Sequence, residues 1–165
     1  MPLFLQNTIR FLLLVLFQVL VLNNIEFLGF VNPYLYILFI IALPVRLPRW
    51  ISLLIAFATG MIIDTFSNTH GMHTFALVLI TFLRTGIIDL FISIEDGNNP
   101  TPTFYTFGMN AYIKYVVLMV LIYHIAFFTL EAFSFVHIWL LLSKIVLSSI
   151  VTFIMIMGLQ TRKSK

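Results

Sequence analysis

Long apolar runs separated by short polar turns make up most of this sequence. The runs cover residues 9–22, 30–45, 50–66, 72–94, 112–133 and 138–159. A helix that crosses the hydrocarbon core of a bilayer needs about 20 mostly apolar residues, and the later runs reach or approach that length. The pattern predicts an all-α integral membrane protein with six transmembrane helices, in which residues 1–165 form a single polytopic membrane domain.

The second run is the shortest in uninterrupted apolar sequence. Pro33 opens it and Pro44 closes it, which leaves residues 34–43 without a polar or proline residue. Ten helical residues rise about 15 Å, roughly half the thickness of the hydrocarbon core. Only with its flanking apolar residues does this run become a marginal crossing.

The distribution of cations supports six crossings. With six spans, one side of the membrane receives Arg10, Arg46, Arg49, Lys114, Arg162, Lys163 and Lys165. The loops on the opposite side, around residues 23–32, 67–71 and 134–137, contain no Lys or Arg. The positive-inside rule then places both termini in the cytoplasm. If the second run only re-entered the membrane, Arg46 and Arg49 would lie outside.

Composition excludes several classes of protein. The chain is 61% hydrophobic and 9% charged, whereas soluble domains are about 25% charged. A net charge of +3, scattered along the chain, does not favour nucleic-acid binding. The absence of cysteine excludes disulfides, thiolate metal sites and cysteine nucleophiles. Arg10 precedes an apolar run without a small-residue cleavage motif, so we expect an uncleaved first span.

A stripe of small residues leads to an acid near the end of the third run. Ser52, Ala56 and Gly60 recur every four residues and share one helix face with Asp64. Small side chains allow two helix backbones to approach closely, so we expect a tight helix contact along this stripe. Asp64 is then directed into protein rather than into lipid.

The partner of Asp64 is open to two interpretations. We predict an ion pair with Lys144 in the last run; the alternative is a capped helix end followed by a turn at Gly71. Arg84, within the fourth run, either pairs specifically or extends its side chain toward the interface. Gln18 interrupts the first run and is expected to hydrogen-bond a neighbouring helix.

Catalytic and metal chemistry receive little support. His70 and His73 have a spacing that could place both on one face of a helix near Asp64, but Gly71 between them favours a turn. The sequence lacks the Gly-x-Ser-x-Gly and Gly-x-x-x-x-Gly-Lys motifs. We therefore predict no catalytic residues, no metal site and no cofactor, and a protein that is not an enzyme.

Several segments, taken in order, resemble a known family. They are Leu-Tyr-Ile-Leu-Phe-Ile-Ile-Ala-Leu-Pro at 35–44, Pro48-Arg49-Trp50, Gly60-Met-Ile-Ile-Asp64, and Gly71-x-His73. Their order and spacing, together with the chain length and span layout, resemble the rod shape-determining MreD family, especially its Bacteroidetes-like members. The resemblance extends over nearly the whole chain.

This resemblance implies a function and a fold. It implies a multi-pass subunit of the bacterial inner membrane that belongs to the cell-elongation complex and helps to maintain cell shape. The implied partners are MreC, a single-pass membrane protein, and also MreB, RodA and a penicillin-binding transpeptidase of peptidoglycan synthesis. The implied fold has six helices and is similar to the substrate-binding subunits of energy-coupling-factor transporters. The family offers no catalytic residues to carry over.

The sequence is compatible with two functions. The first is a non-enzymatic scaffold that binds MreC and helps to couple wall synthesis to the MreB cytoskeleton. The second is a subunit that binds or transports a small molecule or lipid precursor, which requires a pocket with converging polar groups. Polar residues available for such a pocket are few: Asp64, His70, His73, Arg84, His124 and Lys144. Their scarcity, and the short loops, favour the scaffold.

Overall fold

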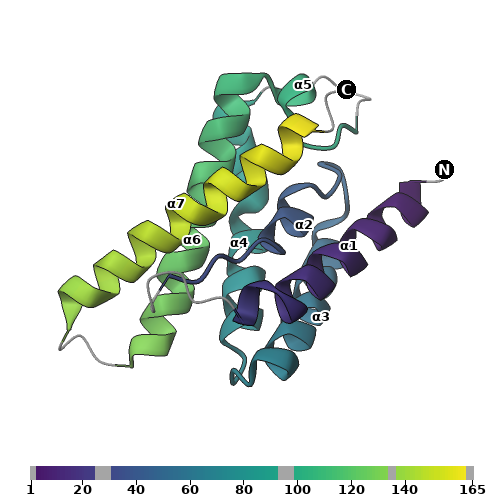
Figure 1. Cartoon of the computed structure of the whole chain (residues 1–165). Helices are drawn as coiled ribbons and strands as arrows, with labels where there is room; N and C mark the ends of the chain where they lie inside the picture. The colour runs from purple at the N-terminus through teal and green to yellow at the C-terminus, as the bar shows by residue number, and fades with distance from the viewer. Residues whose placement is uncertain (1–2, 25–30, 93–98, 134–136, 163–165) are drawn as a thin grey trace.

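The computed structural model describes residues 3–24, 31–92, 99–133 and 137–162, and all of its secondary-structure elements are helices. In chain order they are α1 (Leu3–Leu20), the 3-10 helix η1 (Leu22–Asn24), α2 (Ile37–Ile41), α3 (Arg49–Ser67), α4 (Met72–Phe91), α5 (Phe104–Phe107), α6 (Met109–Ala132) and α7 (Ile138–Arg162). Figure 1 shows that α3, α4, α6 and α7 are long, whereas α2 and α5 are short.

Four helices of the described part are long and apolar enough to cross a membrane, namely α3, α4, α6 and α7. They coincide within a few residues with the last four predicted runs. In α1, the apolar part of the described helix is shorter and covers Thr8–Leu20. The prediction of six transmembrane helices is therefore wrong in number, although the all-α, multi-pass character of the chain agrees with these four helices.

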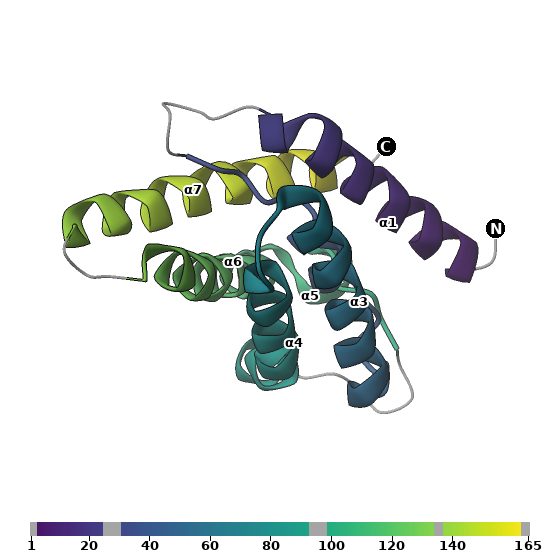
Figure 2. The same cartoon turned by 90° about the horizontal axis from the view of Figure 1, so that it is seen from below.

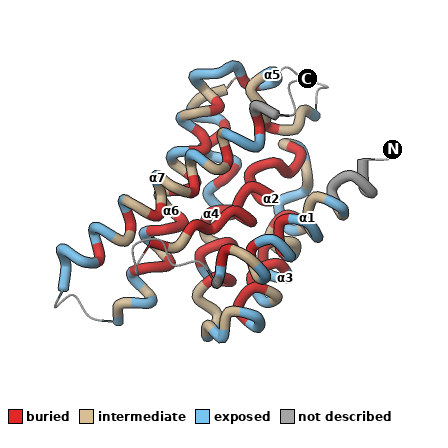
Figure 3. Tube along the Cα trace, in the orientation of Figure 1, coloured by how far each residue is buried: buried red, intermediate tan, exposed pale blue. Residues whose placement is uncertain are grey.

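The second predicted span, residues 30–45, accounts for the largest difference. From residue 31 to 36 its backbone is not helical, and α2 then adds only five helical residues. Every residue from 33 to 44 is buried, and Figure 3 shows this segment as a continuous buried stretch in the middle of the molecule. Residues 31–44 are called the central segment below.

The central segment lies between two layers of helices. Seen from below, α1 and α7 lie on one side of it and α3, α4 and α6 on the other (Figure 2). Its beginning contacts the start of α4 at His73, and its end contacts Arg84 of the same helix. His73 and Arg84 are eleven residues apart, which is about 16 Å along α4, so the contacts of the segment extend over roughly that length of the helix. A non-helical backbone at membrane depth is tolerated where protein surrounds it.

Helices α3 and α4 form a closely packed hairpin. Asn68 and Gly71 both adopt left-handed backbone conformations in the turn, with φ of 54° and 82°. At Gly60 the two helices touch: a Cβ atom placed there would lie 2.3 Å from the Cα of Thr74. The structure thus places the predicted stripe of Ser52, Ala56 and Gly60 in a buried helix contact.

Candidate functional site

Asp64 holds the N-terminus of α4. Its Oδ1 accepts hydrogen bonds from the Thr69 hydroxyl (2.6 Å) and the His73 backbone N–H (3.1 Å). Its Oδ2 accepts from the backbone N–H and the hydroxyl of Thr74, at 2.9 and 2.6 Å. The first N–H groups of a helix lack hydrogen-bond partners within the helix, and they lie at the end where the helix dipole is positive. Asp64 therefore caps α4 from the preceding helix, and its charge is met by helix-end donors.

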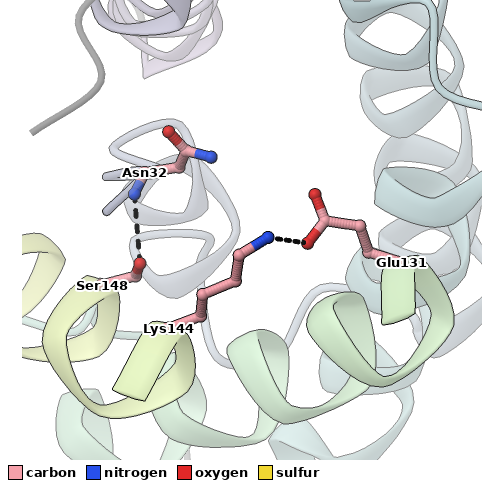
Figure 4. Close-up of polar contacts among 4 residues, drawn as sticks. All are labelled: Asn32, Glu131, Lys144 and Ser148. Atoms are coloured by element: carbon pink, nitrogen blue, oxygen red, sulfur yellow. Dashed lines mark hydrogen bonds and ion pairs between the residues drawn. The ribbon is translucent and has the colours of Figure 1, made fainter. Parts of the chain in front are cut away.

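The predicted ion pair between Asp64 and Lys144 is wrong. Lys144 Nζ instead contacts Glu131 Oε2 at 3.0 Å, between the end of α6 and the start of α7 (Figure 4). Both side chains of this pair are partly exposed, at 23% for Lys144 and 36% for Glu131. The alternative of a capped helix end describes Asp64 better, although the helix it caps is the following one. Glu131 was missed, although its position shortly before the α6–α7 turn could have indicated it.

Arg84 is 3% exposed and binds the end of the central segment. Its guanidinium donates to the carbonyl oxygens of Leu43 and of Pro44, the latter at 3.4 Å. Its Nε donates to the Tyr115 hydroxyl at 3.1 Å, and that hydroxyl donates to the Ile41 carbonyl at 3.1 Å. Carbonyl groups at the C-terminal end of a helix carry partial negative charge. Arg84 thus neither extends to the interface nor pairs with an acid, because the carbonyls of Leu43 and Pro44, just after α2, and the Tyr115 hydroxyl are its acceptors.

Neutral side chains provide hydrogen-bond partners for the backbone at the beginning of the central segment. Gln18 of α1 accepts from the Leu35 backbone N–H at 2.9 Å and donates to the Pro33 carbonyl at 3.0 Å. On the other side, Ser148 and Thr152 of α7 accept from the backbone N–H groups of Asn32 and Tyr34, both at 3.1 Å (Figure 4 shows the first). These bonds replace those that a helix would have made internally. The prediction for Gln18 holds in kind, but its partner is not a regular helix.

A buried triad joins the central segment to α4 and α6. The hydroxyls of Tyr36 and Tyr123 lie 2.7 and 2.6 Å from His73 Nδ1, and the two hydroxyls also contact one another. His124, the residue after Tyr123, contacts the Val120 carbonyl through Nδ1 (2.8 Å) and Thr152 Oγ1 through Nε2 (3.3 Å). Tyr36 and Tyr123 were missed because tyrosine within an apolar run gives no sign of which residue it will meet.

The two predicted histidines do not converge. His73 is buried at 2% exposure, whereas His70 is exposed in the turn. Within the described residues, no group of three or more His, Cys, Asp or Glu side chains could hold a metal ion. The buried polar groups bind backbone and one another, an arrangement that positions elements of the fold.

A polar cavity of about 320 Å³ lies at the end of the molecule where α3 turns into α4. Side chains from α1, η1, the central segment, the α3–α4 hairpin and α6 line it: Gln18, Val19, Leu22, Asn23, Asn32, Pro33, Tyr34, Phe66, Ser67, Thr69, His73, Phe127 and Glu131. Asn23 donates to Ser67 at 2.8 Å across its wall, which ties η1 to the end of α3. No protein-family model, curated protein or solved structure matches this chain.

Proposed function

We propose that this chain is a non-enzymatic scaffold subunit of a bacterial cell-elongation complex, in the inner membrane and with both termini in the cytoplasm. The observation that carries this proposal is the order and spacing of the segments at 35–44, 48–50, 60–64 and 71–73, which resemble the MreD family. Its proposed partners are an MreC-like single-pass protein and, through the complex, MreB, RodA and a penicillin-binding transpeptidase.

The use of the buried polar groups supports a scaffold. Asp64, Arg84 and Gln18 all bind backbone groups and so hold helices and the central segment in fixed positions. A fixed body suits a protein that presents a surface to partners, because little ordering free energy is then lost on binding. Large apolar side chains on the outside of α1, α3 and α7, such as Leu13, Leu54 and Ile150, are available to lipid or to a partner helix.

Purification of the tagged chain from bacterial membranes in mild detergent tests this function. We expect a stoichiometric single-pass membrane protein to co-purify, and depletion of the chain to convert rods into spheres. Photo-crosslinking residues at Leu13, Leu54 and Ile150 then identify the face that contacts the partner, with buried Leu77 as the matched control. Recovery of the chain alone, together with unchanged cell shape, would overturn the proposal.

Single cysteines test the orientation. The chain has no native cysteine, so Met109→Cys at the start of α6 and His70→Cys in the α3–α4 turn can each be labelled specifically. Both native residues are exposed. We expect a membrane-impermeant maleimide to label intact inner-membrane spheroplasts at His70→Cys only, and inverted vesicles at Met109→Cys only. Labelling of both variants from one side contradicts the proposed topology.

The second candidate function, binding of a small molecule or lipid precursor, is favoured by one observation, the polar cavity beside Glu131 and His73. A scaffold can also hold a ligand, so the two functions are compatible. Retention of a small molecule by the purified chain would support the second function whether or not a partner protein co-purifies.

A further inference from the structure

Glu131 offers a negatively charged oxygen to the polar cavity. Lys144 contacts only Oε2, and Figure 4 shows the other carboxylate oxygen pointing away from Lys144. Within the described residues, this second oxygen has no hydrogen-bond partner, although Glu131 lines the cavity. No Lys or Arg belongs to the described lining; Lys144 lies outside it and contacts Glu131 through Oε2 alone, which leaves the second oxygen without that contact.

His73 offers a hydrogen-bond donor to the same cavity. If Nδ1 accepts, the hydroxyl hydrogens of Tyr36 and Tyr123 both find acceptors within the triad; if Nδ1 carried the proton, one of them would have none. The proton of the neutral imidazole therefore lies on Nε2, which makes no hydrogen bond to the described residues. His73 lines the cavity, so this N–H is one donor that a ligand can use.

Aromatic rings complete the wall. Tyr34, Phe66 and Phe127 line the cavity, and the rings of Tyr34 and Phe127 lie 4.9 Å apart in an edge-to-face arrangement. Faces of aromatic rings attract organic cations, and they do so more strongly where water is partly excluded. The carboxylate, the rings and the N–H of His73 together match a cation with an adjacent oxygen.

We propose that this cavity binds an amino-alcohol group of the ethanolamine type. Its ammonium is held by the second oxygen of Glu131 and by the aromatic rings, and its alcohol or ester oxygen accepts the Nε2–H of His73. The chemistry is shared by a free small amine and by the head group of phosphatidylethanolamine. This inference deepens the binding function proposed above and does not rest on the scaffold function, so either can fail without the other.

Thermal unfolding of the purified chain in phosphatidylglycerol nanodiscs tests the free amine. A ligand that binds the folded state raises the unfolding midpoint as its concentration rises. We expect ethanolamine hydrochloride to raise the midpoint more than equal concentrations of sodium chloride or sodium acetate. An equal response to all three compounds, together with no response to the lipid arm below, overturns the proposal.

Variants of the ion pair separate binding from general stabilisation. In Glu131→Gln the charged acceptor is lost, and we expect ethanolamine to bind about tenfold more weakly. In Lys144→Met the carboxylate loses its competing cation, so binding is expected to become tighter. Asp89→Asn removes a carboxylate from an exposed site on α4 and is the matched control, with unchanged binding. Weaker binding in Lys144→Met, or equal binding in Glu131→Gln, overturns the proposal even if one variant folds poorly.

Lipid composition distinguishes the two sources. We expect nanodiscs that contain phosphatidylethanolamine to stabilise the wild-type chain relative to phosphatidylglycerol alone, and to weaken the response to added ethanolamine, if the head group occupies the cavity. Glu131→Gln should lose that difference. A response to free ethanolamine that is the same in both lipids assigns the cavity to a soluble amine.

Discussion

Asp64 and Arg84 lie in the interior, whereas Glu131 and Lys144 lie at the partly exposed end of α6 and α7. The outer pair neutralises itself through one contact of 3.0 Å. Each inner charge instead faces the end of a helix: Asp64 the N-terminus of α4, and Arg84 the C-terminal carbonyls beyond α2. At Asp64 the sign of the charge complements the dipole of α4, and at Arg84 the positive charge meets two carbonyl oxygens in the turn that follows α2.

The difference follows from the cost of burial. A buried charge is tolerated where several hydrogen bonds replace its hydration, and helix ends supply several unpaired groups at one place. A single side chain of opposite charge supplies fewer hydrogen bonds than a helix end does. At a partly exposed site water completes the hydration, so a single contact between Glu131 and Lys144 is sufficient there.

The largest expected effect is at Asp64. Asp64→Ala leaves the N–H groups of His73 and Thr74 and two hydroxyls without their acceptor, so we expect a loss of about 3–5 kcal/mol in the free energy of unfolding. Titration with denaturing detergent, followed by circular dichroism, measures it. Asp64→Asn should lose less, because one oxygen still accepts. If Asp64→Asn equals the wild type, the negative charge is irrelevant to the cap.

A slightly smaller effect is expected at Arg84. Arg84→Met keeps much of the side-chain volume but leaves the carbonyls of Leu43 and Pro44 without this donor, at a cost of about 2–4 kcal/mol. Arg84→Lys is the matched variant. It retains the positive charge but loses the planar guanidinium, so its stability should lie between those of the wild type and Arg84→Met. The same unfolding titration applies. Equal stability of Arg84→Met and wild type would show that α2 does not depend on this contact.

The close approach at Gly60 comes third. Gly60→Ala places a Cβ against the backbone of Thr74 and should cost about 1–3 kcal/mol, because α3 and α4 must separate. A Cβ at Gly86 meets nothing within 4 Å, so Gly86→Ala is the control and should be neutral or slightly stabilising. Asp64 lies one turn beyond Gly60 on α3, so moving α3 away from α4 should also weaken the hydrogen bonds between Asp64 and the start of α4. Identical midpoints for the two variants would contradict the close contact.

The smallest effect concerns the outer pair. A double-mutant cycle of Glu131→Ala and Lys144→Ala should give a coupling free energy of about 0–1 kcal/mol, as partly exposed ion pairs do. In contrast, Asp64→Ala and Lys144→Ala should be strictly additive, because these residues have no common partner. Coupling between Asp64 and Lys144 above about 1 kcal/mol would restore the pair expected from sequence.

The sequence by itself determined the features that are local along the chain. Helices α3, α4, α6 and α7 follow from continuous apolar runs, and the α3–α4 turn follows from the polar residues up to Gly71. The spacing of Ser52, Ala56 and Gly60 also indicated a packing face, because helical periodicity fixes which residues share a face.

Only the tertiary structure decided what the polar residues contact. Asp64 and Lys144 are compatible in charge, but α7 packs on α6, which brings Lys144 to Glu131 instead. The same holds for residues 31–44: their apolar composition suits a membrane helix and a buried segment equally. Whether they form a helix or a buried non-helical segment depended on residues far away in the sequence. The side chains of Gln18, Ser148, Thr152 and Arg84 bind the backbone N–H and carbonyl groups of this segment that have no partner within a helix.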